Sequence, residues 1–121
     1  MIAIKDSEQL LLAGDEGLLK ATKDQAIKHS FQGRPIRSVC LISESIYLVG
    51  FYYYGMIVWN EQTDQQLFQI CQVDVFSIKR ILTTNTYIIK TRKNGLKSLT
   101  IKNLKTLKFS LQHILEAKEV Y

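Results

Sequence analysis

A short phrase of sequence recurs three times along this chain and constrains its fold more than any other feature. The clearest copy is Leu48-Val49-Gly50, followed by a loop and by Gly55-Met56-Ile57-Val58-Trp59. The loop glycines of the three copies, Gly17, Gly55 and Gly95, recur at a nearly constant spacing. Self-similarity at a period of about 40 residues is typical of β-propeller blades and other stacked arrays. The repeat therefore predicts an architecture, although it says little about a partner.

The middle copy has the pattern of four short β-strands. Ile36–Ile42 is rich in apolar and β-branched residues and follows the turn-forming Gly33-Arg34-Pro35. Three further strand-like segments follow at hairpin spacing, at Ile46–Gly50, Met56–Trp59 and Gln66–Ile70. Four short strands within one repeat, joined by short loops, predict one antiparallel blade.

The third copy keeps the order and spacing of the second. The loop glycine precedes a leucine of the fourth expected strand by the same interval in both, from Gly55 to Leu67 and from Gly95 to Leu107. The first copy is shorter, as a terminal blade would be. The expected strands of the third copy are Val75–Leu82, Thr86–Thr91, Leu96–Ile101 and Thr106–Leu111, and those of the first are Met1–Lys5, Gln9–Ala13, Leu18–Thr22 and Ala26–Phe31.

These strands predict a single all-β unit, a partial β-propeller of about three four-stranded antiparallel blades. The approximate blade boundaries are 1–33, 34–72 and 73–111, and residues 112–121 are expected to form a tail. Within Leu111–Lys118, the residues Leu111, Ile114 and Leu115 fall at helical spacing. The alternative fold is a small β-sandwich or barrel in which the repeat phasing is accidental.

The middle copy resembles a WD-repeat blade. In that family a strand ending in small residues, a loop glycine and a hydrophobic strand ending in Trp-Asp recur, and here the terminal pair is Trp59-Asn60. The matching pairs in the flanking copies are Ala21-Thr22 and Leu99-Thr100, so the signature is specific only in the middle third. The resemblance implies a propeller that acts as a scaffold for protein complexes.

Three blades are fewer than the four to eight with which propellers typically close. An open array would expose strand edges and the apolar flanks of its outer blades, which invites aggregation. The chain is therefore expected to be a fragment of a longer propeller, one half of an oligomeric ring, or a module completed by another protein. A partial gene product without independent activity is a further alternative.

Composition and side-chain inventory argue against catalysis and cofactors. The chain is 46% hydrophobic and has neither a signal-peptide pattern nor an apolar stretch near the roughly 20 residues needed to span a bilayer, so a soluble, intracellular, cytoplasmic protein is expected. Cys40 and Cys71 are far apart along the chain and the two histidines are isolated, which predicts structural thiols, no metal and no cofactor. Asp15 and Glu16 share a loop but have no nucleophile or phosphate-binding motif beside them, so no enzyme is expected.

The formal charge of +5 is distributed unevenly. Between Asp74 and Glu116 there is no acidic residue but nine lysines and arginines, among them Arg92 and Lys93 in a predicted loop. The plain interpretation is a solvated outer face, because several of the lysines alternate with apolar residues along expected strands. The functional interpretations are a surface for an acidic protein, for RNA or for anionic phospholipid.

A run of four aromatic residues, Phe51, Tyr52, Tyr53 and Tyr54, precedes the loop glycine of the middle copy. Loops favour small polar residues, whereas tyrosines suit protein interfaces because they offer a large contact area at little entropic cost. The alternative is that two of the rings pack between blades and two cap the sheet edge. Trp59 is expected in the core. Together, these features predict a non-catalytic protein-interaction scaffold whose expected contacts are Phe51–Tyr54, Arg92 and Lys93.

Overall fold

The computed structural model describes residues 2–5, 9–24, 27–53, 55–70, 75–93, 95–103 and 108–115, and their side chains over 9–24, 27–53, 55–70, 75–93 and 95–102. Within these ranges the chain is all-β, with twelve strands and no helix. The strands form three four-stranded antiparallel sheets, and none of the sheets closes into a barrel. The sequence-based prediction of three four-stranded sheets is confirmed.

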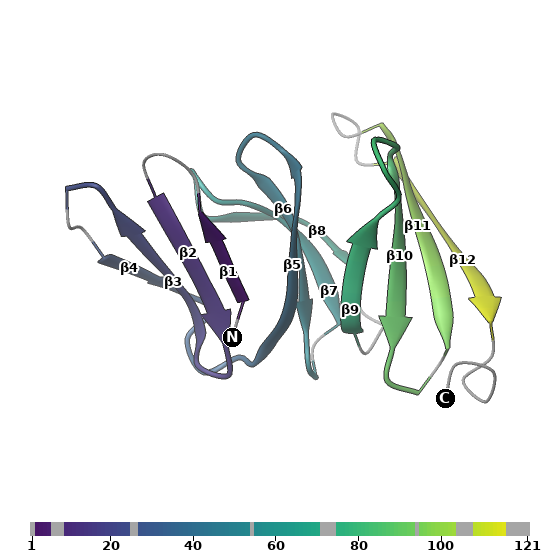
Figure 1. Ribbon diagram of the computed structural model, residues 1–121, viewed down its shortest axis with the longest axis horizontal. Helices are drawn as coiled ribbons and strands as arrows, with labels where there is room; N and C mark the ends of the chain where they lie inside the picture. The colour runs from purple at the N-terminus through teal and green to yellow at the C-terminus, as the bar shows by residue number, and fades with distance from the viewer. Residues whose placement is uncertain are drawn as a thin grey trace.

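Each sheet is a meander whose strands follow one another in chain order. The three sheets stand side by side along the long axis of the molecule (Figure 1). The first contains β1 (Ile2–Lys5), β2 (Gln9–Gly14), β3 (Gly17–Thr22) and β4 (Ile27–Ser30); the second contains β5 (Ile36–Ser43), β6 (Ile46–Phe51), β7 (Met56–Asn60) and β8 (Gln65–Ile70); the third contains β9 (Val75–Arg80), β10 (Thr86–Thr91), β11 (Leu96–Asn103) and β12 (Lys108–Leu115).

The repeat of the sequence is also a repeat of backbone hydrogen bonds. The Phe51 amide donates to the Gly55 carbonyl at 2.8 Å, and the Thr91 amide, at the same position of the next copy, donates to the Gly95 carbonyl at 3.0 Å. Both glycines have positive φ, 81° and 78°, which a side chain would strain. In the first sheet, Gly14 pairs with Gly17 across a shorter turn.

One prediction was wrong at the C-terminal side of the third sheet. Residues 112–115, where the beginning of a tail was expected, belong to β12, which runs to Leu115. The strand pairs with β11 in a register that sets Leu99 opposite Leu111 and Lys97 opposite His113. This long-range pairing overrides a local pattern of only three apolar residues. Residues 116–121 lie outside the described part of the chain.

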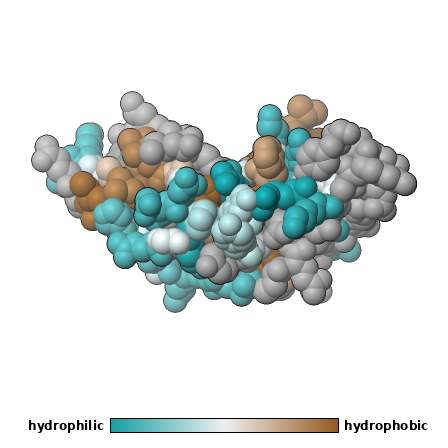
Figure 2. All heavy atoms as spheres, turned by 90° about the horizontal axis from the view of Figure 1, so that it is seen from below, coloured by the Kyte–Doolittle hydropathy of each residue, from teal (hydrophilic) through white to brown (hydrophobic). Residues whose placement is uncertain are grey.

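The apolar core lies in two layers, one on each face of the middle sheet. Along β6 and β7 the side chains alternate: Tyr47, Val49 and Trp59 face the first sheet, whereas Leu48 and Val58 face the third. Strands β5 and β9 are in contact, and so are β2 and β5. A buried hydrogen bond also joins the second and third sheets: the Ile78 amide donates at 3.1 Å to the hydroxyl of Ser38. The packed sheets give the molecule a crescent outline (Figure 2).

Gly50 allows the second and third sheets to approach closely. A Cβ atom there would lie 2.5 Å from Cγ1 and 2.8 Å from Cβ of the buried Val75. Gly50→Ala is therefore expected to lower the free energy of unfolding by about 2 kcal/mol, because the two backbones must move apart. Urea denaturation of the purified variants measures this change.

Val75→Ala supplies the matched control for this prediction. In the Gly50→Ala/Val75→Ala double variant, the added methyl group occupies space that the valine vacates. The double variant is therefore expected to be more stable than the sum of the two single changes predicts. Strict additivity would show that Gly50 and Val75 do not form this contact.

Candidate protein-binding rim

Tyr52 lies where the loops of the second and third sheets meet. Its amide donates to the Pro35 carbonyl at 3.0 Å, which fixes the start of the β6–β7 loop against the segment leading into β5. The guanidinium carbon of Arg92, in the β10–β11 loop, lies 3.9 Å from the centre of the Tyr52 ring. That of Arg37, on β5, lies 4.4 Å from the same centre. Two cations therefore hold one aromatic ring by cation–π contacts.

Tyr53 extends this arrangement to solvent. Its ring meets that of Tyr52 edge to face, with the centroids 4.3 Å apart at 83°, and the residue is 68% exposed. Lys93, next to Arg92, is also exposed. We call Arg37, Tyr52, Tyr53, Arg92 and Lys93 the aromatic–basic rim. The structure thus brings together two features that sequence analysis had found in separate copies of the repeat.

The other two aromatic residues of the predicted set differ from Tyr52 and Tyr53. Phe51 is fully buried, with its ring 5.2 Å from that of Phe31 and the Arg34 guanidinium 3.9 Å from its centre. It therefore offers no surface to a partner in this structure, and packs between sheets as the alternative interpretation of the aromatic run required. Tyr54 lies outside the described residues.

Arg37 was missed by sequence analysis. It stands in an ordinary strand between Ile36 and Ser38, with no local signal of a contact to Tyr52. Its position at the rim depends on the pairing of Ile36 with Phe51, which only the folded sheet defines. By contrast, Tyr52 and Arg92 occupy the same position in successive copies of the repeat, and stacked repeats place such positions side by side.

Hydrogen bonds and an ion pair join the first and second sheets beside Trp59. The Trp59 indole donates to Asp64 Oδ1 at 2.9 Å, and the Ser30 hydroxyl donates to the same oxygen at 3.2 Å. Lys20 forms an ion pair with Glu61, a carboxylate only 4% exposed. Trp59 is itself 2% exposed, which confirms its predicted place in the core.

The cysteines contribute no reactive site that the structure describes. Burial raises the pKa of the Cys40 thiol, an effect only partly opposed by the nearby Arg80 guanidinium. The thiol is therefore mostly protonated at neutral pH and a poor nucleophile. Cys71 lies outside the described residues. Within the described residues, no three His, Cys, Asp or Glu side chains gather as a metal site would require.

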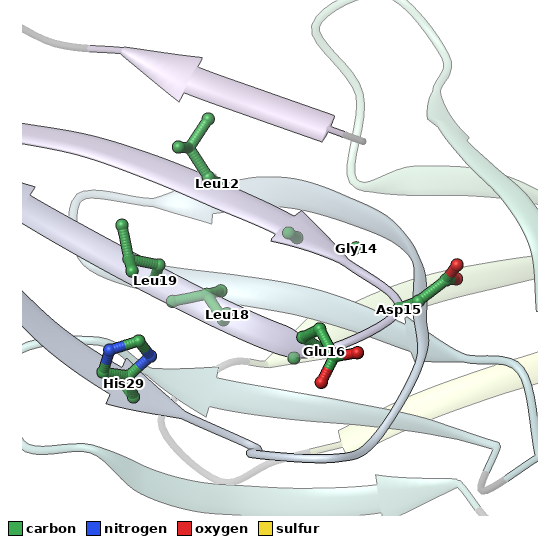
Figure 3. A pocket seen from close by; sticks show the side chains of 9 residues that line it. Leu12, Gly14, Asp15, Glu16, Leu18, Leu19 and His29 are labelled. Atoms are coloured by element: carbon green, nitrogen blue, oxygen red, sulfur yellow. The ribbon is translucent and has the colours of Figure 1, made fainter.

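A hollow of about 240 Å³ lies beside the β2–β3 turn. Leu12, Leu19 and His29 lie in a row across three neighbouring strands, with Asp15 and Glu16 at the turn (Figure 3). The two carboxylates point in different directions, so they do not form an acid–base pair aimed at one substrate (Figure 3). The lining of the hollow is mainly apolar and includes Leu12 and Leu19.

Among known proteins, no protein-family model matches the chain, and no curated protein matches its sequence. Among the described residues, no helical segment has the length and apolar character that a membrane crossing demands. Function must therefore be inferred from the surfaces of the molecule.

Proposed function

We propose that this chain is a non-catalytic protein-interaction scaffold, an array of WD-repeat-like blades completed by another chain or by a second copy. The aromatic–basic rim is its docking surface for an acidic segment of a protein partner. One observation carries the proposal: Tyr52 is held by Arg37 and Arg92, which come from two different sheets, while Tyr53 beside it stays open to solvent.

Energetic considerations support the rim as a binding surface. Tyrosine and arginine are among the residues most often found at the energetic centre of protein interfaces. Because Tyr52 is already packed against two guanidinium groups, little side-chain freedom remains to be lost when a partner binds. The rim is rich in basic side chains, so it attracts carboxylates. Rigid sheets on either side hold these groups in place.

The proposal is tested with peptides selected on the protein itself. A displayed library of random peptides is panned on the purified chain, and the affinity of the enriched peptides is measured by fluorescence anisotropy. We expect acidic peptides to be enriched, and Tyr53→Ser to weaken their binding about tenfold, as loss of an interface tyrosine does. Equal binding to the wild type and to Tyr53→Ser would contradict the proposal.

Two controls separate this function from its alternatives. Phe76→Ser removes another exposed aromatic ring, 54% exposed and outside the rim, and should leave the affinity unchanged. A labelled single-stranded RNA and vesicles of anionic phospholipid are measured in the same assay. Tight binding of either that falls steeply with salt, and that Tyr53→Ser does not weaken, would favour a basic surface for phosphate groups instead.

A further inference from the structure

The first sheet has an apolar face against which no described element packs. Residues opposite one another on antiparallel strands share a face. The register therefore gives two rows across β2, β3 and β4 on the side away from the core: Leu10, Ala21 and Ile27 in one, and Leu12, Leu19 and His29 in the other. Ile27 is 63% exposed, and apolar side chains are visible at this end of the molecule (Figure 2). We call these six residues the free apolar face.

The free apolar face occupies the positions at which the other two sheets contact a preceding sheet. Leu10 pairs with Ala21 as Tyr47 pairs with Trp59, and the second pair is buried against the first sheet. The same registers give the other corresponding positions. Leu12 corresponds to Val49 in the second sheet and to Ile89 in the third, and Leu19 corresponds to Ile57 and Lys97. In the third sheet, Tyr87 and Leu99 correspond to Leu10 and Ala21. All of these positions in the second and third sheets are buried except Lys97, which is half-buried. The free apolar face of the first sheet therefore has the positions needed to pack against another sheet.

The third sheet carries a face of the matching kind. Ile88 and Leu96 lie on the side of the third sheet away from the core, at the positions where Leu48 and Met56 of the second sheet pack against its successor. Both are half-buried, and Lys90 lies between them at the position of Gly50. The two ends of the array thus carry the two halves of one interface.

Charge identifies a second copy of the chain as the occupant. Within the molecule, the β6–β7 loop touches the β10–β11 loop of the next sheet, through Tyr52 and Arg92. Repeating that packing between copies sets Arg92 and Lys93 of one chain beside the β2–β3 turn of the next. That turn carries Asp15 and Glu16, both exposed at the edge of the free apolar face. Opposite charges therefore meet at the same end of the interface at which the apolar rows pack.

We propose that the free apolar face of one copy packs against the third sheet of a second copy, head to tail, in the manner of the internal sheets. Two copies joined in this way at both ends supply six sheets, within the range of about four to eight with which propellers close. This inference deepens the proposed scaffold function and rests on its array of sheets, but it does not depend on the rim as a peptide-binding surface.

The first test removes the apolar contact. The mass of the wild-type chain is measured by light scattering behind size exclusion, and its dissociation constant by sedimentation equilibrium. We expect a wild-type dimer, and for Leu12→Gln/Leu19→Gln a dissociation constant higher by about a hundredfold or more, because two buried leucines are lost. A wild-type monomer, or a double variant that dimerises like the wild type, would overturn the inference.

The second test changes the charged side chains of the two loops, outside the apolar core. Asp15→Lys/Glu16→Lys and Arg92→Glu/Lys93→Glu are each expected to weaken association about fivefold, as exposed ion pairs do. An equimolar mixture of the two variants restores opposite charges at both junctions, so it should associate more tightly than either variant alone. If mixing gives no recovery, the head-to-tail geometry is wrong.

The rim and the dimer can fail separately. Tyr53→Ser alters the proposed peptide-binding surface and should leave the mass of the dimer unchanged. Asp15→Lys/Glu16→Lys weakens the junction and should still bind the selected acidic peptides. Arg92 and Lys93 belong to both the rim and the junction, so the rim is judged on Asp15→Lys/Glu16→Lys, in which no junction carboxylate competes for these cations. A monomer that binds those peptides through Tyr53 would overturn only the proposed dimer. A wild-type dimer whose Asp15→Lys/Glu16→Lys variant binds none of them would overturn only the rim.

Discussion

Replacing Trp59 by alanine is expected to lower the free energy of unfolding by about 4 kcal/mol, the largest effect of any single truncation in this chain. Trp59 is the largest fully buried side chain and lies between the first and second sheets. Its ring packs edge to face against Phe31, with the centroids 5.2 Å apart, and at a tilt against Tyr47, at 6.1 Å. Truncation leaves a cavity that two rigid sheets cannot close, and it removes a hydrogen bond to Asp64.

The two contributions of Trp59 can be separated by urea denaturation of a second variant. Trp59→Phe keeps most of the ring but loses the donor to Asp64, so it should cost only about 1–2 kcal/mol. Phe76→Ala is the control for an aromatic side chain that is 54% exposed, and should cost no more than about 1 kcal/mol. If Trp59→Ala were no more harmful than Phe76→Ala, the packing between the first two sheets would not hold in solution.

The repeat of this fold could be predicted because the residues that form its turns and strands can be recognised from short stretches of sequence. Gly55 and Gly95 are needed where the backbone takes a positive φ, and the strands on either side are apolar and β-branched. Such signals are read over a few residues and need no knowledge of the partner strand. The order, number and approximate limits of the strands therefore followed from the sequence.

The end of the third sheet could not be predicted in the same way. Leu111, Ile114 and Leu115 have a spacing that suits a helix, and nothing within the segment itself rejects that conformation. The outcome is set by β11, which offers a long row of backbone groups that β12 can pair with. Secondary structure decided by a neighbouring strand is beyond a local pattern.

The candidate site was predictable only in its separate parts. The sequence singled out Tyr52 and Tyr53 because aromatic residues are unusual in loops. It singled out Arg92 and Lys93 because they fall in a predicted loop within a stretch that has no acidic residue. That Tyr52 and Arg92 touch depends on the stacking of successive sheets, and that Arg37 joins them depends on the register of β5. Phe51 belonged to the same aromatic run but is buried, because alternation along β6 turns it into the core.

The second large effect is expected at the Lys20–Glu61 ion pair, which spans the first and second sheets. Lys20→Met should lower the free energy of unfolding by about 3 kcal/mol, because it leaves the carboxylate of Glu61 buried without its cation. Glu61 is only 4% exposed, and the side-chain amide of Gln9, at 3.4 Å, is a weak substitute. Methionine keeps the length of the lysine stem, so the loss reports on charge more than on packing. Urea denaturation at neutral pH measures it.

Replacing Glu61 instead of Lys20 should lower the free energy of unfolding by less, and replacing both residues by less still. The Lys20 side chain is 22% exposed, so after Glu61→Gln its ammonium group can turn towards water, and a cost of about 1–2 kcal/mol is expected. In Lys20→Met/Glu61→Gln no buried charge remains, and stability should recover to well above that of Lys20→Met alone. Should the double variant instead be the least stable of the three, the pair would contribute attraction that exceeds the cost of burying it.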